Sequence, residues 1–208
     1  MFYTTINQTS LLTQLQDMAA YNLWAITRLT GWLQSKPDTL LETAAASSFP
    51  GIKATLQHIL EVEQGWLGHL QQAPAGIRQE PDGSLEAVLD SLVEHAGAFN
   101  DYVQSLTEEE LQEDCYCNVL FVGEICRPRF EIIQHCLNHS TYHRGQVVTI
   151  GHQVGLKDAP MTDYMFYVLR VKAFAGSKGL PGEKMERREG KRQPAVRNSF
   201  LAVNFFSK

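Results

Sequence analysis

The sequence lacks the features that mark membrane-spanning, secreted and nucleic-acid-binding proteins. No run of 18 consecutive apolar residues occurs among its 208 residues, so we expect no transmembrane helix and no membrane partner. The first ten residues lack the basic start and the apolar run of a secretory signal, which predicts a cytoplasmic protein. An excess of positive charge is also missing. The 18 basic and 23 acidic side chains give a net charge of −5, which disfavours nucleic acid as a partner.

Cysteine is scarce, and its spacing is not that of a zinc ribbon or a redox pair. The cysteines are Cys115, Cys117, Cys126 and Cys136. Without a secretory signal, we expect them to be free structural thiols and not a disulfide framework. Cys115 and Cys117 are alternate residues, so a strand would place both on one face.

Charge divides the chain into two parts. Residues 1–170 carry 9 basic and 20 acidic side chains, whereas residues 171–208 carry 9 basic and 3 acidic ones. The second part also contains four glycines and two prolines, and it ends in an apolar stretch at 200–206. We expect one domain over 1–170 and a basic extension over 171–208 that is not a separate domain. A solvated arm with an apolar anchor is the favoured interpretation of the extension, and a patch for an acidic partner is the alternative.

Hydrophobic periodicity in the first part predicts helices. The four long ones are expected after a cap at Thr9 or Ser10, over about 52–71, after a cap at Ser84, and over about 128–154. Residues 115–128 are expected to form a short hairpin or an irregular loop. A short final helix, opened by Asp158 or Thr162, should extend to about residue 170. The fold class predicted is therefore all-α, an antiparallel four-helix bundle with a short additional C-terminal helix.

Histidines concentrate in the fourth predicted helix, where His135, His139 and His143 are spaced by four residues and share one face. Two imidazoles one turn apart can reach the same ion. All three cannot, because the outer two are about 12 Å apart along the helix axis. A further ligand must then come from another helix. The second predicted helix offers His58, which has apolar neighbours, and His69, which lies near the helix end.

With these residues the chain resembles the DinB/YfiT-like superfamily, whose four-helix bundles are proposed to be metal-dependent enzymes. The resemblance spans most of residues 10–170 and rests on four stretches, 21–25, 56–67, 138–146 and 159–164. In that family, one histidine of the second helix and two of the fourth bind a metal. The resemblance therefore implies His58, His139 and His143 as the metal ligands here, and it does not extend to residues 171–208.

The expectations for other residues of these helices are less specific. His135 is left as a hydrogen-bond partner of a ligand or a core residue, and His69, His95 and His152 should be dispensable for metal binding. Glu61 or Glu63 could hold the distal ring nitrogen of a ligand, although solvated helix positions are favoured for both. Arg144 is expected to pair with a carboxylate, and Gly145 to permit close helix packing.

Three neutral imidazoles leave a coordination position for water or substrate, unlike a closed structural site. Zinc and nickel both suit imidazole ligands. The resemblance implies a metal-dependent hydrolase or thiol S-transferase acting on a small molecule, with a low-molecular-weight thiol as a candidate substrate. The alternative is a non-catalytic metal- or ligand-binding protein related to stress, which a site sealed by Trp66, Tyr142 or the extension at 171–208 would favour. Members of the superfamily are often dimers, so we also expect a homodimer.

Overall fold

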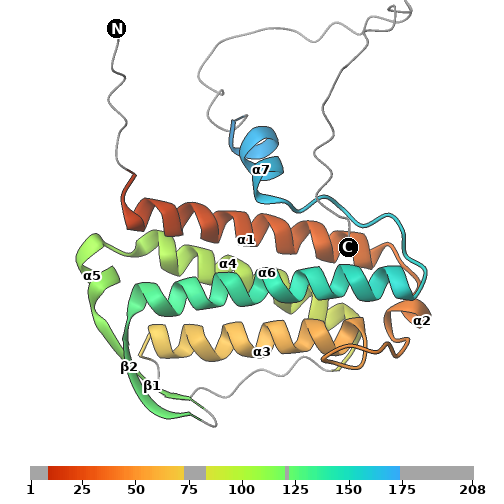
Figure 1. Cartoon of the computed structure of the whole chain (residues 1–208), viewed down its shortest axis with the longest axis horizontal. Helices are drawn as coiled ribbons and strands as arrows, with labels where there is room; N and C mark the ends of the chain where they lie inside the picture. The colour runs from red at the N-terminus through yellow and green to blue at the C-terminus, as the bar shows by residue number, and fades with distance from the viewer. Residues whose placement is uncertain (1–8, 73–82, 120–121, 174–208) are drawn as a thin grey trace, which may run out of the picture.

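The computed structural model of the protein describes residues 9–72, 83–119 and 122–173. Four long helices form a bundle (Figure 1): α1 (Leu11–Gln34), α3 (Ile52–Leu70), α4 (Leu85–Ser105) and α6 (Arg129–Gln153). The shorter elements are α2 (Asp38–Leu41), α5 (Glu108–Gln112), β1 (Asp114–Val119), β2 (Gly123–Pro128), α7 (Tyr164–Tyr167) and a π-helical turn, η1 (Val168–Lys172). The prediction of an all-α helical bundle is confirmed.

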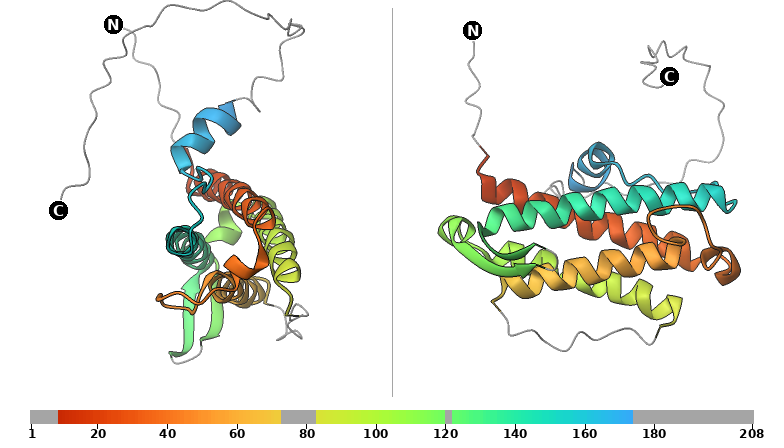
Figure 2. Two further views of the ribbon diagram at one scale, coloured as in Figure 1. Left: turned by 90° about the vertical axis from the view of Figure 1, so that its right-hand side faces the viewer. Right: turned by 60° about the horizontal axis from the view of Figure 1, so that its bottom comes forward.

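The helices α1 and α6 run in one direction, and α3 and α4 run in the other (Figure 1). Each long helix packs mainly against one antiparallel and one parallel neighbour. The order around the bundle is α1, α4, α3, α6 (Figure 2, left). Side-chain hydrogen bonds mark these directions. Gln16 near the start of α1 bonds the backbone of Gln104 near the end of α4, and the Tyr102 hydroxyl donates to the carbonyl of Leu70, where α3 ends.

The ends of the helices follow from local chemistry. Ser10 and Ser84 cap α1 and α4, each accepting a hydrogen bond from a backbone N–H of the first turn, as predicted. The short C-terminal helix is capped by Asp163, and not by Asp158 or Thr162 as expected. Before α3, Gly51 has φ +120°, and a Cβ there would lie 2.9 Å from the carbonyl oxygen of Thr43, so this tight turn requires glycine.

The buried apolar side chains form two main clusters, one in each half of the bundle. The cluster at the α2 end includes Ile26, Leu29, Leu56, Ile59, Leu92, Val147 and Ile150. The cluster at the hairpin end includes Leu15, Leu70, Phe99, Val103, Ile132 and Ile133. Between the two clusters along the helices lies a buried polar layer made of Asn22, Glu63, Ser140 and Arg144. These four residues, which belong to α1, α3 and α6, therefore lie at the same height along the bundle axis.

The segment before α6 forms a hairpin, the first of the two alternatives predicted. The strands β1 and β2 pair antiparallel, with Cys115 opposite Arg127 and Cys117 opposite Ile125. Cys115 and Cys117 are buried free thiols on one face of β1, whereas Tyr116 between them is exposed. The expected strand alternation of the two cysteines is therefore confirmed.

Aromatic side chains attach α7 to the outside of α1. The Tyr21 ring lies 5.2 Å from that of Tyr164 and 5.7 Å from that of Tyr167, and its hydroxyl donates to the carbonyl of Thr162 at 2.7 Å. The expected extension at 171–208 lies almost wholly outside the described residues. In the described part of the chain, no helix is both long and apolar enough to cross a membrane.

Candidate metal centre

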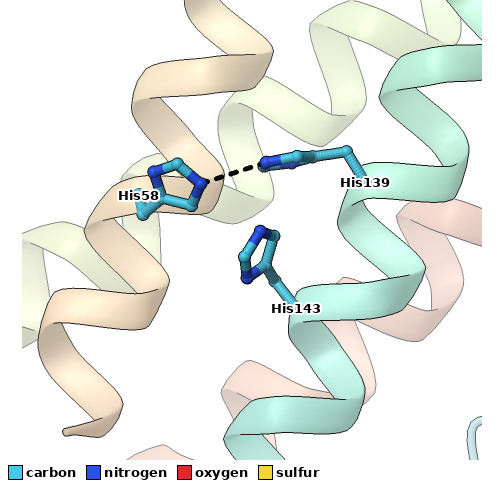
Figure 3. A group of neighbouring side chains, drawn as sticks. All are labelled: His58, His139 and His143. Atoms are coloured by element: carbon cyan, nitrogen blue, oxygen red, sulfur yellow. Dashed lines mark hydrogen bonds between the residues drawn. The ribbon is translucent and has the colours of Figure 1, made fainter. Parts of the chain in front are cut away.

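Three histidines from two helices converge in the middle of the bundle (Figure 3). His58 projects from α3 toward His139 and His143, which lie one turn apart on α6. The Nε2 atoms of His58 and His139 are 3.1 Å apart, and one nitrogen of each of the three rings lies within 4.8 Å of the others. Two ligands of one tetrahedral zinc ion are separated by ~3.4 Å. These three side chains could therefore hold a metal ion.

The environment keeps two of these rings neutral near pH 7. Burial, together with the neighbouring imidazoles of His143, His58 and His135, lowers the pKa of His139 to about 4. Burial and the nearby His143 also lower the pKa of His58. Both rings can then present a lone pair, which is the form of histidine that binds a metal.

Gln146 fixes the orientation of the third ring. Nδ1 of His143 lies 2.7 Å from Oε1 of Gln146, so this nitrogen carries the proton and donates to the amide oxygen, which leaves Nε2 as the acceptor. The Gln146 amide in turn donates to Ser48 Oγ at 3.2 Å and to the Tyr142 hydroxyl at 3.1 Å. The local sequence pattern indicates no role for Gln146. Its position three residues after His143 on one helix was the signal that could have identified it.

A phenyl ring from the loop between α2 and α3 covers part of the cluster. Phe49 stacks on His58 with 4.1 Å between the ring centroids, and its ring meets the edge of His143 at 5.7 Å. It restricts the freedom of both imidazoles and shields them from water on that side. From the sequence, Phe49 is recognisable only as a residue of the turn before α3. Its contact with the histidines could not be predicted, because it depends on the path of the loop.

The remaining histidines lie outside the cluster. His135 is exposed, and its ring stands 5.8 Å from that of His139 and 5.2 Å from that of Trp66. The His69 ring also contacts Trp66, with 5.7 Å between the ring centroids. Among the described residues, the group able to hold a metal contains His58, His139 and His143 and none of these others.

The two glutamates considered at the sequence level behave differently. Glu61 is exposed, as expected, but Glu63 is only 1% exposed, so the expectation of a solvated position is wrong for Glu63. Its Oε1 accepts hydrogen bonds from the Ser140 hydroxyl and from Asn22 Nδ2, the latter at 3.2 Å. It bonds no histidine within the described structure. Glu63 belongs to the buried polar layer. The pattern of apolar residues in α3 does not indicate that an acidic residue is buried there.

Arg144 belongs to the same polar layer, but it does not contact the Glu63 carboxylate directly. Its guanidinium donates to Asn22 Oδ1 and, at 3.0 Å, to Thr141 Oγ1. Asn22 therefore bridges Arg144 to Glu63. The expected direct pairing of Arg144 with a carboxylate is not made among the described residues. These bonds connect α1, α3 and α6 at the level of the histidines.

The expectation that Gly145 permits close helix packing is wrong. A Cβ at position 145 would meet no atom within 4 Å. The close approach occurs at Gly151, two turns later, where a Cβ would lie 2.9 Å from Cη2 of Trp32. The absent side chain at 151 thus lets the indole of α1 pack directly against α6.

The histidine cluster is open to solvent along one side. His58 and His139 are partly exposed, and Tyr142, which could have sealed the site, is 62% exposed. Trp66 packs beside His135 and not over the cluster. Solvent therefore reaches His58 and His139, whereas His143 is only 6% exposed and contacts the rings of Phe49 and Tyr142.

Comparison with known proteins relates this chain to a family and to a curated relative. The family model described as "DinB family" matches residues 7–171. Protein DinB of Bacillus subtilis (strain 168) is 26% identical over 161 residues, which cover 73% of this chain and 92% of that protein. Both matches concern the part of the chain that forms the bundle and carries the three histidines.

Proposed function

The chain belongs to the DinB family, and from that premise we propose that His58, His139 and His143 bind one divalent transition metal used for chemistry on a small molecule. The observation that carries the proposal is the convergence of three imidazoles from α3 and α6 at a site that solvent reaches. A structural metal site is usually closed by four protein ligands, whereas three ligands and access from solvent are typical of catalytic sites.

The donor set favours zinc or nickel. Three neutral imidazoles, with no thiolate or carboxylate among them, suit both ions and do not discriminate between them. When bound, such an ion would supply Lewis acidity, which favours ionisation of a coordinated water or thiol and polarises a carbonyl. The reaction class proposed is therefore hydrolysis of a small molecule or transfer of a low-molecular-weight thiol to an electrophile.

The chain's own residues prepare the site for this role. Gln146 holds the His143 ring in the tautomer that presents Nε2, and such partners commonly govern metal affinity. Phe49 excludes water from one side of His58. The polar layer fixes the relative positions of α3 and α6, because Glu63 on one helix accepts a hydrogen bond from Ser140 on the other.

A metal analysis followed by an activity screen tests this proposal. Protein purified without added ions should contain close to one equivalent of a divalent transition metal. A panel of esters, amides and electrophiles, each assayed with and without a low-molecular-weight thiol, should show turnover that chelation abolishes. His135→Ala is the matched control for His139→Ala, because the two residues lie one turn apart on the same helix. Stoichiometric metal without metal-dependent turnover on any substrate would overturn the catalytic proposal and leave a binding protein.

We also propose that the protein is a homodimer. The apolar stretch at 200–206 of the sequence is more easily sheltered across a subunit interface than on an isolated chain. Light scattering at micromolar concentration should give twice the chain mass of 23.4 kDa. A monomer mass under those conditions would refute this proposal without affecting the metal site.

A further inference from the structure

A pocket lies on the side of α6 that faces away from the histidines. It is an open pocket of about 780 Å³ between α6, α1 and the segment 157–164, and its walls include Tyr21, Arg144, Val148, Lys157, Met161 and Tyr164. On α6 it is lined by positions 141, 145, 148 and 152, which share one helical face. Because residues 143 and 145 differ by about 200° around the axis, this pocket and the histidine cluster occupy opposite faces of the helix.

A buried cation forms part of the pocket wall. Arg144 is 3% exposed, and its direct partners are neutral: the Asn22 amide oxygen, the Thr141 hydroxyl and the ring of Tyr21, whose centroid lies 5.5 Å from the guanidinium carbon. Glu63 reaches it only through Asn22. Burial of a charged group is costly unless an opposite charge or hydrogen bonds compensate it. An anion in the pocket would supply a compensation that the direct partners of Arg144 do not.

The acidic side chains near the pocket are already engaged. Asp163 accepts hydrogen bonds from two backbone N–H groups of α7. Asp158 binds the Trp32 indole and the Lys36 ammonium, and Asp17 binds the Tyr164 hydroxyl and the Lys172 ammonium. Asp163 lines the pocket, and its carboxylate is engaged by the backbone N–H groups of α7.

A second cationic side chain, Lys157, lies at the pocket. Lys157 is exposed at the rim and has no ion-pair partner among the described residues, and His152 is exposed beside it. Among the charged residues that line the pocket, Arg144 and Lys157 are opposed by one carboxylate, that of Asp163, so positive charge is in excess by one. The rest of the wall is largely apolar, with Val148 on α6 and Met161 beyond it.

We propose that this pocket is a second binding site, separate from the histidine cluster, and that it takes a small organic anion with an aromatic-sized apolar body. The carboxylate or phosphate of such a molecule would lie toward Arg144 and Lys157, and its apolar body would contact Val148, Met161 and Tyr164. The size falls within the range of ligand pockets, which is about 300–1,000 Å³. The inference does not depend on the metal or on the reaction proposed for the histidines.

Binding of benzoate, phenyl phosphate and benzamide to the full-length chain tests the charge requirement. Metal is removed beforehand with a chelating resin, so that an anion cannot bind through a metal ion and no chelator carboxylate competes. Titration calorimetry should detect both anions, while benzamide, which has the shape of benzoate without its charge, should bind at least about tenfold more weakly. Binding of benzamide as tight as that of benzoate, or no binding of either anion at millimolar concentration, would overturn the proposal.

Charge reversal at the rim tests the location. Lys157→Glu should weaken the binding of benzoate by about tenfold, because it replaces an attraction by a repulsion of similar size. Arg127→Glu makes the same change in net charge on the exposed strand β2, far from the pocket, and should leave binding unchanged. Equal weakening in both variants would show a response to net charge alone and would refute a specific site.

The methyl group of Met161 reports the site directly. In protein labelled at the methionine methyl groups, benzoate should shift the Met161 resonance, which is identified by its absence in Met161→Leu. The shift should persist in zinc-loaded protein and in His139→Ala, because the two sites are independent. Loss of benzoate binding in His139→Ala would place the anion at the histidines and overturn the inference, whatever the activity of the protein.

Discussion

Removal of one imidazole from the histidine cluster gives the sharpest test of the metal centre. In His139→Ala, the ring nitrogen that lies 3.1 Å from His58 Nε2 is lost, and two ligands on different helices remain. Two imidazoles without a third have no fixed geometry for one ion, so we expect stoichiometric zinc binding to disappear. The helix itself should persist, because alanine is the residue best suited to a helix interior.

The size of the effect follows from linkage between binding and folding. A ligand that binds only the folded state stabilises it by about 2.7 kcal/mol when its free concentration is 100 times its dissociation constant. For a chain of this length, 1 kcal/mol corresponds to a change in melting temperature of about 2–4 °C. Zinc should therefore raise the melting temperature of the unmodified protein by about 5–11 °C, and it should leave that of His139→Ala unchanged.

Scanning calorimetry with and without zinc measures this difference, and circular dichroism checks the helical content of each variant. His135→Ala is the control, since His135 is exposed and its ring lies outside the group of converging nitrogens. It should retain the full zinc-dependent shift. An equal shift in His139→Ala and in the unmodified protein, or loss of the shift in His135→Ala, would refute the assignment of the ligands.

Three further predictions concern neighbours of the cluster and the packing of α6. Gln146→Ala should weaken zinc binding by about 10- to 100-fold in a competition titration, because the ligand ring loses the acceptor that orients it; an unchanged affinity would contradict that role. Gly151→Ala should cost about 1–3 kcal/mol in the free energy of unfolding, since its Cβ would lie 2.9 Å from Trp32, whereas Gly145→Ala should be neutral or stabilising; the opposite order in urea denaturation would contradict the packing. The metal-free protein should lose stability as the pH falls from about 6.5 to 4, because over this range the unfolded chain binds a proton at His139 that the folded state, with its pKa lowered to about 4, does not. His139→Ala should lose less stability than the unmodified protein over the same range, and an equal loss in both would show that other groups dominate.

The sequence predicts the helices well because their ends carry strong local signals. Ser10 and Ser84 stand directly before apolar periodic segments, and both cap helices in the structure. The cluster of His58, His139 and His143 is also predictable, although only in part from the spacing of the histidines. Spacing limits the ligands on α6 to two neighbours, and the resemblance to a known family adds His58. Before the short C-terminal helix, the local sequence offers several residues of the type that caps a helix. The structure shows that Asp163 is the cap, and not Asp158 or Thr162.

The contacts around the histidine site could not be predicted from local sequence patterns. Phe49 reaches the histidines only because the loop from α2 folds back across α3, and nothing in its immediate sequence specifies that path. Glu63 lies on a helix whose apolar positions predict a buried face, but burial of an acid depends on partners 41 and 77 residues away. The packing glycine was misplaced for the same reason, because the indole that requires Gly151 comes from α1.

The polar layer explains why the histidine site should be formed before any metal binds. Asn22, Glu63 and Ser140 are each at most 1% exposed and bond one another across α1, α3 and α6, so each would be left unpaired and buried if these helices shifted. Leaving a buried polar group without its partner costs about 1–3 kcal/mol, and more for a charged one. That penalty fixes the relative positions of α3 and α6 at the level of the histidines, and two apolar clusters hold the bundle on either side. Metal binding should therefore act on a folded chain, unlike zinc-finger peptides, in which binding of the ion drives folding. Metal-free protein should accordingly give the same helical circular dichroism as the loaded form, and substantial loss of helix on metal removal would show that the layer does not hold the site.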